Sequence, residues 1–226
     1  MFTEKSFIAA VEESFRMYKQ HGARSTEKLK PIHKYIANVL KSIWGDDCEV
    51  HYLGAGSKEL TVTGKYYSKK IDVTITQDNK PVFCLGIKFI ISNYKQNAPN
   101  YMENMLGETA NIQALGNLPY AQLIILPLFP PYFKKDGSLK HMEQVNDHDI
   151  QKYLNLVFDS PQAHRPNFIG IQVINLDEQT GKVSLTHVEK SFSENTAKLL
   201  KEKLALSHFF NEIAQYKHYY LSKRNG

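Results

Sequence analysis

The sequence is poor in the residues that disulfide-rich and zinc-binding scaffolds need. Its 226 residues include two cysteines, Cys48 and Cys84, which cannot build a disulfide framework and show no Cys/His spacing of a zinc site. None of its nine histidines lies in an HNH or HExxH spacing. No Walker A or GxGxxG sequence is present, so we do not expect nucleotide or dinucleotide chemistry.

Long apolar runs are also lacking. The longest stretch, residues 123–133, is interrupted by three prolines and is too short to span a bilayer. Residues 1–15 carry acids within their apolar pattern and have no small-residue cleavage site, so we expect no signal peptide. These absences predict a cytoplasmic protein without a membrane partner.

The composition predicts a single basic domain. Apolar residues make up 42% and aromatic residues 12% of the chain, which is enough for a sizeable core. Lys and Arg outnumber Asp and Glu by 28 to 23, and a sequence pI near 9.0 favours a polyanionic partner.

Hydrophobic periodicity predicts alternating helices and strands. Period-3.6 patterns predict helices over residues 4–20, 26–44, 101–115, 146–158 and 193–221. Strand patterns cover residues 60–67, 70–76, 82–91, 120–128, 168–175 and 182–187. This order predicts an α/β (α+β) fold, with a mixed sheet flanked by helices in one domain over 1–226.

Three ionisable features could carry chemistry. Asp72 lies on the polar face of a hairpin strand, and Lys88 is the single charge in the apolar strand that follows. Glu103 and Glu108 lie on the next helix. A carboxylate, a strand lysine and a helical glutamate in this order are typical of a divalent-metal phosphodiesterase, because carboxylate oxygens bind Mg²⁺ and lysine neutralises phosphate charge.

The runs KYYSKKIDVTI, PVFCLGIKF and SNYKQNAPNYMENMLGETANI resemble the PD-(D/E)XK nuclease superfamily, and within it the type II restriction endonucleases. The resemblance covers residues 59–111 closely and extends loosely to later segments. It implies an αβββαβ core and an enzyme of prokaryotic cytoplasm, a site-specific deoxyribonuclease that hydrolyses double-stranded DNA with Mg²⁺. A structure-specific repair or recombination nuclease and an inactive DNA-binding module are the alternatives.

Two positions depart from the family pattern. Ile71 replaces the proline before the aspartate, and Gly86 stands where the second acid is expected. Some members supply that acid from the following helix, so we expect Glu103 to fill a vacant position beside Gly86, with Glu108 and Glu59 as alternatives. The resemblance then implies catalysis by Asp72, Lys88 and Glu103, and metal binding by Asp72, Glu103 and the main-chain carbonyl of Ile87.

Amide-rich and basic segments near this site are the candidates for DNA contact. We expect residues 1–45 and 190–226 to form the interface of a homodimer that reads a palindrome, around a catalytic core over 50–175. The expected DNA-contacting side chains are Asn93, Lys95, Gln96, Asn97, Lys69, Lys70, Lys134 and Lys135.

Overall fold

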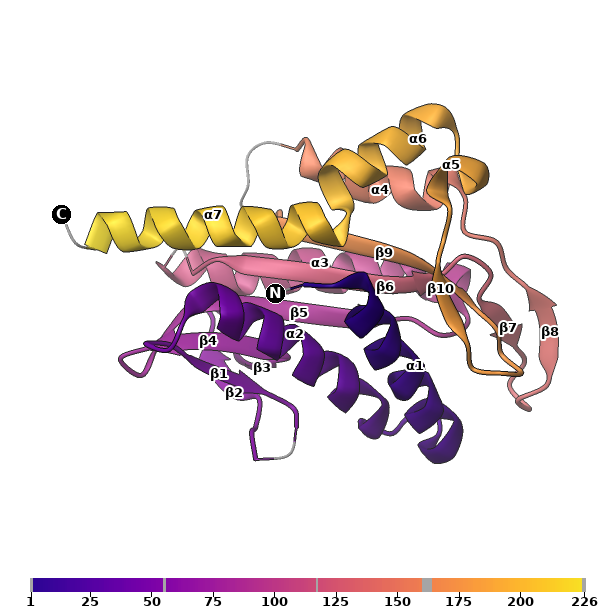
Figure 1. Ribbon diagram of the computed structural model, residues 1–226, viewed down its shortest axis with the longest axis horizontal. Helices are drawn as coiled ribbons and strands as arrows, with labels where there is room; N and C mark the ends of the chain where they lie inside the picture. Colours follow the sequence, from indigo (N-terminus) through magenta and orange to yellow (C-terminus); the bar gives the residue numbers. More distant parts are fainter. Residues whose placement is uncertain (1, 55, 117, 160–163, 225–226) are drawn as a thin grey trace.

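The computed structural model describes residues 2–54, 56–116, 118–159 and 164–224 (Figure 1). Its centre is a six-stranded mixed sheet with the strand order β1-β4-β5-β6-β9-β10. The β5–β6 and β6–β9 pairs are parallel, and the β1–β4, β4–β5 and β9–β10 pairs are antiparallel. The six strands are β1 (Glu49–Tyr52), β4 (Val73–Gln77), β5 (Lys80–Phe89), β6 (Tyr120–Pro127), β9 (Phe168–Leu176) and β10 (Val183–Leu185).

Two small hairpins stand beside this sheet. One pairs β2 (Leu60–Thr63) with β3 (Ser68–Ile71), and the other pairs β7 (Pro131–Phe133) with β8 (Leu139–Met142). Without the β2–β3 hairpin, the chain order from α2 to β6 is helix, three strands, helix, strand. The order is the expected one, but its first strand is the unpredicted β1, and the predicted strand 60–67 lies outside the central sheet as β2.

Helices cover both faces of the sheet (Figure 1). One face packs on α1 (Glu4–His21), α2 (Lys30–Trp44) and α7 (Leu206–Arg224), with the 3-10 helix η1 (Glu27–Leu29) before α2. The other face packs on α3 (Tyr94–Gly116), α4 (Asp147–Val157), α5 (Val188–Ser191), α6 (Glu194–Leu199) and the π-helix η2 (Leu200–Leu204). A mixed sheet flanked by helices confirms the predicted α/β (α+β) class.

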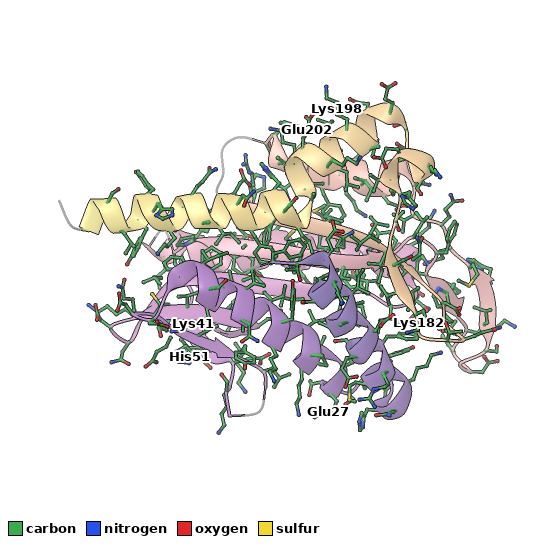
Figure 2. All side chains as sticks on the ribbon, viewed as in Figure 1. Glu27, Lys41, His51, Lys182, Lys198 and Glu202 are labelled. Atoms are coloured by element: carbon green, nitrogen blue, oxygen red, sulfur yellow. The ribbon has the colours of Figure 1, made fainter. Side chains whose placement is uncertain are left out.

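Alternation along the strands explains the two apolar layers. In β5 the side chains of Phe83, Leu85 and Ile87 belong to the core under α1, α2 and α7, whereas Cys84 and Lys88 lie on the opposite face. Figure 2 shows side chains filling both layers, with the exposed Lys198 and Glu202 on the outer side of the α6 and η2 layer.

The terminal helices are part of this core. Phe7 of α1, Ile36 of α2 and Phe209 of α7 are fully buried together with residues of the sheet. We expected these segments to lie outside the catalytic core and to form a dimer interface. Their apolar faces are instead used within the chain, so only their outer faces remain for a partner.

Several element boundaries differ from the sequence prediction, and three of the differences have a clear structural reason. The predicted strand 70–76 is divided at Asp72, because β3 pairs with β2 while β4 pairs with β1 and β5. The helix predicted from residue 101 begins at Tyr94 and continues through Pro99, since buried Tyr94 and Ala98 anchor its first turns in the core. The predicted final helix is interrupted by η2 and by the extended backbone of Ala205.

Among the described residues, no helix combines the length and the apolar character required to cross a membrane.

Candidate functional site

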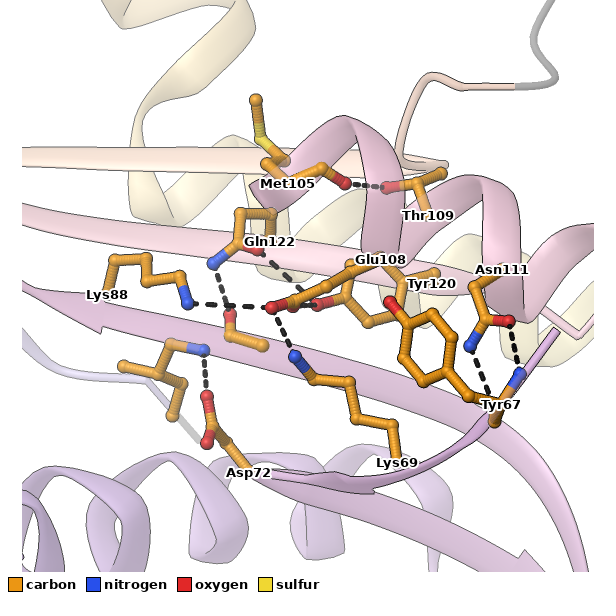
Figure 3. Close-up of polar contacts among 12 residues, drawn as sticks. Tyr67, Lys69, Asp72, Lys88, Met105, Glu108, Thr109, Asn111, Tyr120 and Gln122 are labelled. Atoms are coloured by element: carbon orange, nitrogen blue, oxygen red, sulfur yellow. Dashed lines mark hydrogen bonds and ion pairs between the residues drawn. The ribbon is translucent and has the colours of Figure 1, made fainter. Parts of the chain in front are cut away.

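Asp72 occupies the bend where the chain passes from the small β2–β3 hairpin into the central sheet. Its carboxylate Oδ2 accepts a 2.6 Å hydrogen bond from the main-chain N–H of Ile87 in β5 (Figure 3). The bond ties the bend to the strand that carries Lys88. The side chain of Asp72 is thus fixed beside Lys88 by a hydrogen bond to the main chain of β5.

The second feature is a lysine–glutamate cluster, formed by Lys69, Lys88 and Glu108. The Lys88 Nζ lies 3.8 Å from Oε1 of Glu108, and Lys69 of β3 donates to the same oxygen. Tyr120 at the start of β6 donates its hydroxyl to Oε2 of Glu108 at 2.7 Å. Figure 3 shows the three donors approaching Glu108 from three different strands.

This environment keeps Glu108 ionised. Burial raises the pKa of its carboxyl, but the charge of Lys88 and the hydrogen bonds from Lys69 and Tyr120 outweigh burial, so the net pKa is lowered. The Tyr120 pKa is raised well above its usual value by burial and by the negative Glu108. A neutral phenol therefore donates to a charged carboxylate.

The position beside Gly86 is filled and not vacant. A Cβ at Gly86 would come closer than 3.0 Å to the Tyr120 hydroxyl and within 3.1 Å of Gln122 Oε1. Gln122 also donates to the Gly86 carbonyl at 3.0 Å. A strand carboxylate has no room here, and Tyr120 occupies the space where the family pattern has its second acid.

Asp72 and the lysine–glutamate cluster enclose one small cavity of about 40 Å³. This is room for about one water molecule or a small ion. Three lysines and two carboxylates line it, which gives a net positive wall suited to a phosphate oxygen. Its lining residues are Lys69, Lys70, Ile71, Asp72, Gly86, Lys88, Glu108 and Tyr120.

Glu103 does not enter this cavity. It is exposed on α3, whereas Glu108 is buried with 7% of its surface accessible. Our choice of Glu103 as the residue that fills the position beside Lys88 is therefore wrong, and the alternative Glu108 occupies the site. The five-residue separation places the two side chains about 140° apart around the helix, and α3 presents the Glu108 side to the sheet.

A second group of potential ligands, the histidine–carboxylate cluster, shares Asp72. It comprises His33 of α2, Glu59 just before β2, and Asp72, each offering a ligand atom within 4.8 Å of the others. Burial raises the pKa of Glu59 and the negative Asp72 raises it further, while Lys70 lowers it. Burial lowers the pKa of His33, and Asp72 opposes that effect, so the imidazole is held in its neutral, metal-binding form.

The carbonyl of Ile87 was expected to bind metal. The hydrogen bond described for Ile87 here is that of its N–H to Asp72, and it orients the carboxylate. The role of the carbonyl stays a prediction.

Two amides predicted to read bases are engaged in the fold. Asn93 donates to the carbonyl of Phe133 at 3.0 Å and accepts from its N–H at 3.1 Å, and Asn97 donates to the carbonyl of Asn93 at 2.8 Å. Asn93 therefore connects the β7–β8 hairpin to the start of α3, and its role in contacting DNA stays a prediction. Gln96 and Lys95 are exposed, although Lys95 lies 3.9 Å from Asp149.

Among the lysines predicted to contact phosphate, Lys69 is committed to Glu108. The others, Lys70, Lys134 and Lys135, are exposed. The last two lie in the loop of the β7–β8 hairpin, where the Tyr132 and His141 rings stack with centroids 5.0 Å apart. The loop of this hairpin is therefore basic and exposed, and its contact with DNA stays a prediction.

Sequence reasoning missed four residues of this region. Tyr120 and Gln122 complete the site, His33 contributes a ring nitrogen, and Asn111 holds the β2–β3 turn by accepting from Tyr66 N–H and donating to the Tyr67 carbonyl. Gln122 is the one amide in the apolar run YAQLIILPL, and His33 interrupts an apolar helix face. Those two polar residues at core positions were the signals available in the sequence.

No protein-family model matches the sequence, and no curated protein is similar to it. Among solved structures, one titled "Crystal Structure of Protein of Unknown Function AF1548" is similar, with a TM-score of 0.27 and 13% sequence identity. The aligned region covers 46% of this chain and 48% of that one. The likeness spans about half of each chain and is too slight to bear on fold or function.

Proposed function

We propose that the chain is a divalent-cation-dependent endonuclease of the type II restriction class, which hydrolyses phosphodiester bonds in double-stranded DNA at a specific site. One observation carries the proposal. Asp72 in the bend before β4 and Lys88 in β5 line the same small cavity together with a buried, ionised Glu108. The αβββαβ order of elements around them agrees with the resemblance of the sequence.

In this proposal the lysines supply positive charge to the reacting phosphate. Lys88 points into the cavity with 27% of its side chain exposed, so its ammonium can approach a phosphate oxygen and stabilise the charge that develops in the transition state. Glu108 holds Lys69 and Lys88 in place through its Oε1, while the Tyr120 hydroxyl fixes the carboxylate by donating to Oε2. Glu108 is thus a positioning residue for the lysines.

Asp72 is the cation ligand of the proposed site, with one oxygen already oriented by the Ile87 N–H. A bound Mg²⁺ or Mn²⁺ would polarise the phosphate and lower the pKa of a bound water. Since Glu108 is saturated by cationic and hydroxyl donors, it suits a cation less well than Asp72 does.

Basic side chains on the β7–β8 hairpin and beside the cavity support the proposal that the partner is DNA. Lys70 next to the cavity and the exposed Lys134 and Lys135 would contact the backbone. One active site in each chain cuts one strand, so cleavage of both strands by a homodimer belongs to the proposal. The proposal also places this activity in a prokaryotic cytoplasm.

The test is cleavage of plasmid and phage DNA by the purified chain in Mg²⁺ or Mn²⁺. We expect discrete fragments, and we expect Asp72→Asn and Lys88→Met to abolish them without unfolding the protein. Glu202→Gln and Lys198→Met are controls matched in charge change, because both residues lie on the outer side of α6 and η2 and neither lines the cavity.

Other results would point elsewhere. Cleavage confined to flaps or junctions would indicate the structure-specific alternative. DNA binding without cleavage in either metal would indicate an inactive binding module, and wild-type cleavage by Asp72→Asn or Lys88→Met would contradict the assigned site.

A further inference from the structure

We infer that His33, Glu59 and Asp72 form a binding site for one divalent transition-metal cation of the Mn²⁺ type, with one imidazole and two carboxylate ligands. The three residues come from α2, the segment before β2 and the bend before β4. They are brought together only by the packing of α2 against the edge where the small hairpin leaves the sheet.

The geometry is close to that of a coordination sphere. The potential ligand atoms lie within 4.8 Å of one another. Ligands about 2.1 Å from a metal lie about 3 Å apart in adjacent positions and about 4.2 Å apart in opposite ones. Small side-chain rotations would therefore close the three residues around an ion.

His33 provides a second, independent observation. Its side chain is fully buried, and neither ring nitrogen has a hydrogen-bond partner among the described residues. A buried polar group without a partner costs free energy of folding, and such a group needs a physical explanation. A metal ion bound to one of the nitrogens supplies the missing partner.

The charge of the histidine–carboxylate cluster favours cation binding more than that of the lysine–glutamate cluster does. Glu108 is neutralised by Lys69 and Lys88, whereas no ion pair within 4.0 Å is described for Glu59 or Asp72. Two carboxylates and a neutral imidazole carry a net charge of −2. A divalent cation balances that charge.

The donor set also selects among metals. Carboxylate and water ligands suit Mg²⁺ and Mn²⁺, whereas imidazole favours transition metals over Mg²⁺. We therefore expect Mn²⁺ and Co²⁺ to bind more tightly than Mg²⁺. Cation binding does not depend on nuclease activity, but the catalytic value of this cation rests on the proposed function, since Asp72 also borders the cavity with Lys88.

The experiment measures Mn²⁺ binding to the metal-free full-length chain without DNA. Titration followed by electron paramagnetic resonance gives the stoichiometry and Kd, and pulsed measurements report a nitrogen ligand. We expect one Mn²⁺ per chain with ¹⁴N coupling from one imidazole. In His33→Leu the coupling disappears and the Kd weakens by roughly tenfold or more, and Glu59→Gln weakens it similarly.

Controls use exposed residues of the same type. His148→Leu on α4 and Glu202→Gln on η2 should leave Mn²⁺ binding unchanged. Because both ring nitrogens of His33 lack partners, His33→Leu should fold at least as stably as the metal-free wild type. If His33→Leu does not fold, the Kd of Glu59→Gln and the ¹⁴N coupling of the wild type still test whether the metal site exists.

Absence of ¹⁴N coupling in the wild type, or unchanged binding in both variants, would overturn the inference. DNA cleavage separates this result from the proposed function. Mn²⁺ bound at His33 in a chain that cuts no DNA would leave the metal site standing and refute the nuclease. Full cleavage by His33→Leu would leave the nuclease standing and refute a catalytic role for the cation at His33.

Discussion

Gly86 and Tyr120 occupy complementary space on neighbouring parallel strands, so that a single added carbon at Gly86 would overlap the Tyr120 hydroxyl. That hydroxyl donates to Glu108. The absence of a side chain in β5 therefore allows the Tyr120 hydroxyl to reach the acid that comes from α3. The strand acid of the family pattern and the Tyr120–Glu108 pair are mutually exclusive in this arrangement.

Gly86→Ala should destabilise the fold, by about 1–3 kcal/mol for overpacking in a buried site. Tyr120→Phe removes the atom nearest to the added carbon, so the double variant should lose less free energy of unfolding than the sum of the single variants. Urea unfolding of the four proteins measures the coupling. Strict additivity would show that the two residues do not compete for space.

Glu108→Gln should reduce DNA cleavage strongly, because Lys69 and Lys88 lose the carboxylate that positions them. Glu103→Gln, the same change on the exposed side of α3, should leave cleavage near the wild-type rate. Single-turnover cleavage in Mn²⁺ compares the two variants. Loss of activity in Glu103→Gln alone would return the role to the residue first expected from the sequence.

The stability of the protein should depend on acid through Glu108. Its folded pKa lies below the ordinary value of 4.5, so the unfolded chain binds a proton at this residue more readily than the folded chain does. The stabilisation is therefore present above that value and is lost as pH falls through the folded pKa.

The change in stability can be measured by urea unfolding at pH values between roughly 3 and 6, the range in which carboxylates titrate. The fall in unfolding free energy towards acid should be shallower in Glu108→Gln than in the wild type. Glu103→Gln, which changes an exposed acid, is the matched control. Parallel profiles for wild type and Glu108→Gln would contradict the assigned ion pairs.

Lys134 and Lys135 should contribute to DNA binding without selecting a sequence. Replacing both with alanine should weaken the Kd for every duplex by a similar factor. The dependence of log Kd on log salt should be shallower by about two units, since each phosphate contact releases about 0.9 counterion. Fluorescence anisotropy at several salt concentrations measures this slope, and Lys190→Ala with Lys198→Ala is a control on exposed residues of α5 and α6.

Asn93 should act on stability and not on base reading. Its φ is 52°, so glycine preserves the backbone while it removes the two bonds to Phe133. Asn93→Gly should lower the unfolding free energy by about 1–2 kcal/mol and leave the preferred DNA sequence unchanged. A changed cleavage pattern would show that the amide contacts bases after all.

The α/β class, the two N-terminal helices and most of the central strands could be predicted from local sequence, because periodic apolar side chains specify which face of each element is buried. The approach of Asp72 to Lys88 was also predictable, since one hairpin connects them. The division of residues 70–76 into two strands was not. Asp72 lies between a segment that pairs with β2 and a segment that pairs with β5, and these pairing partners determine where the chain bends.

The sequence by itself therefore determined most of the sheet, its helical cover and one acid–lysine pair. The tertiary structure decided which glutamate joins them, because the side of α3 that meets the sheet depends on where the helix starts. Buried Tyr94 places that start earlier than residue 101, where the sequence predicts it. The tertiary structure also brought His33, Glu59 and Asp72 within reach of one another. Residues from separate elements meet only through packing, and packing is not a property of any local segment.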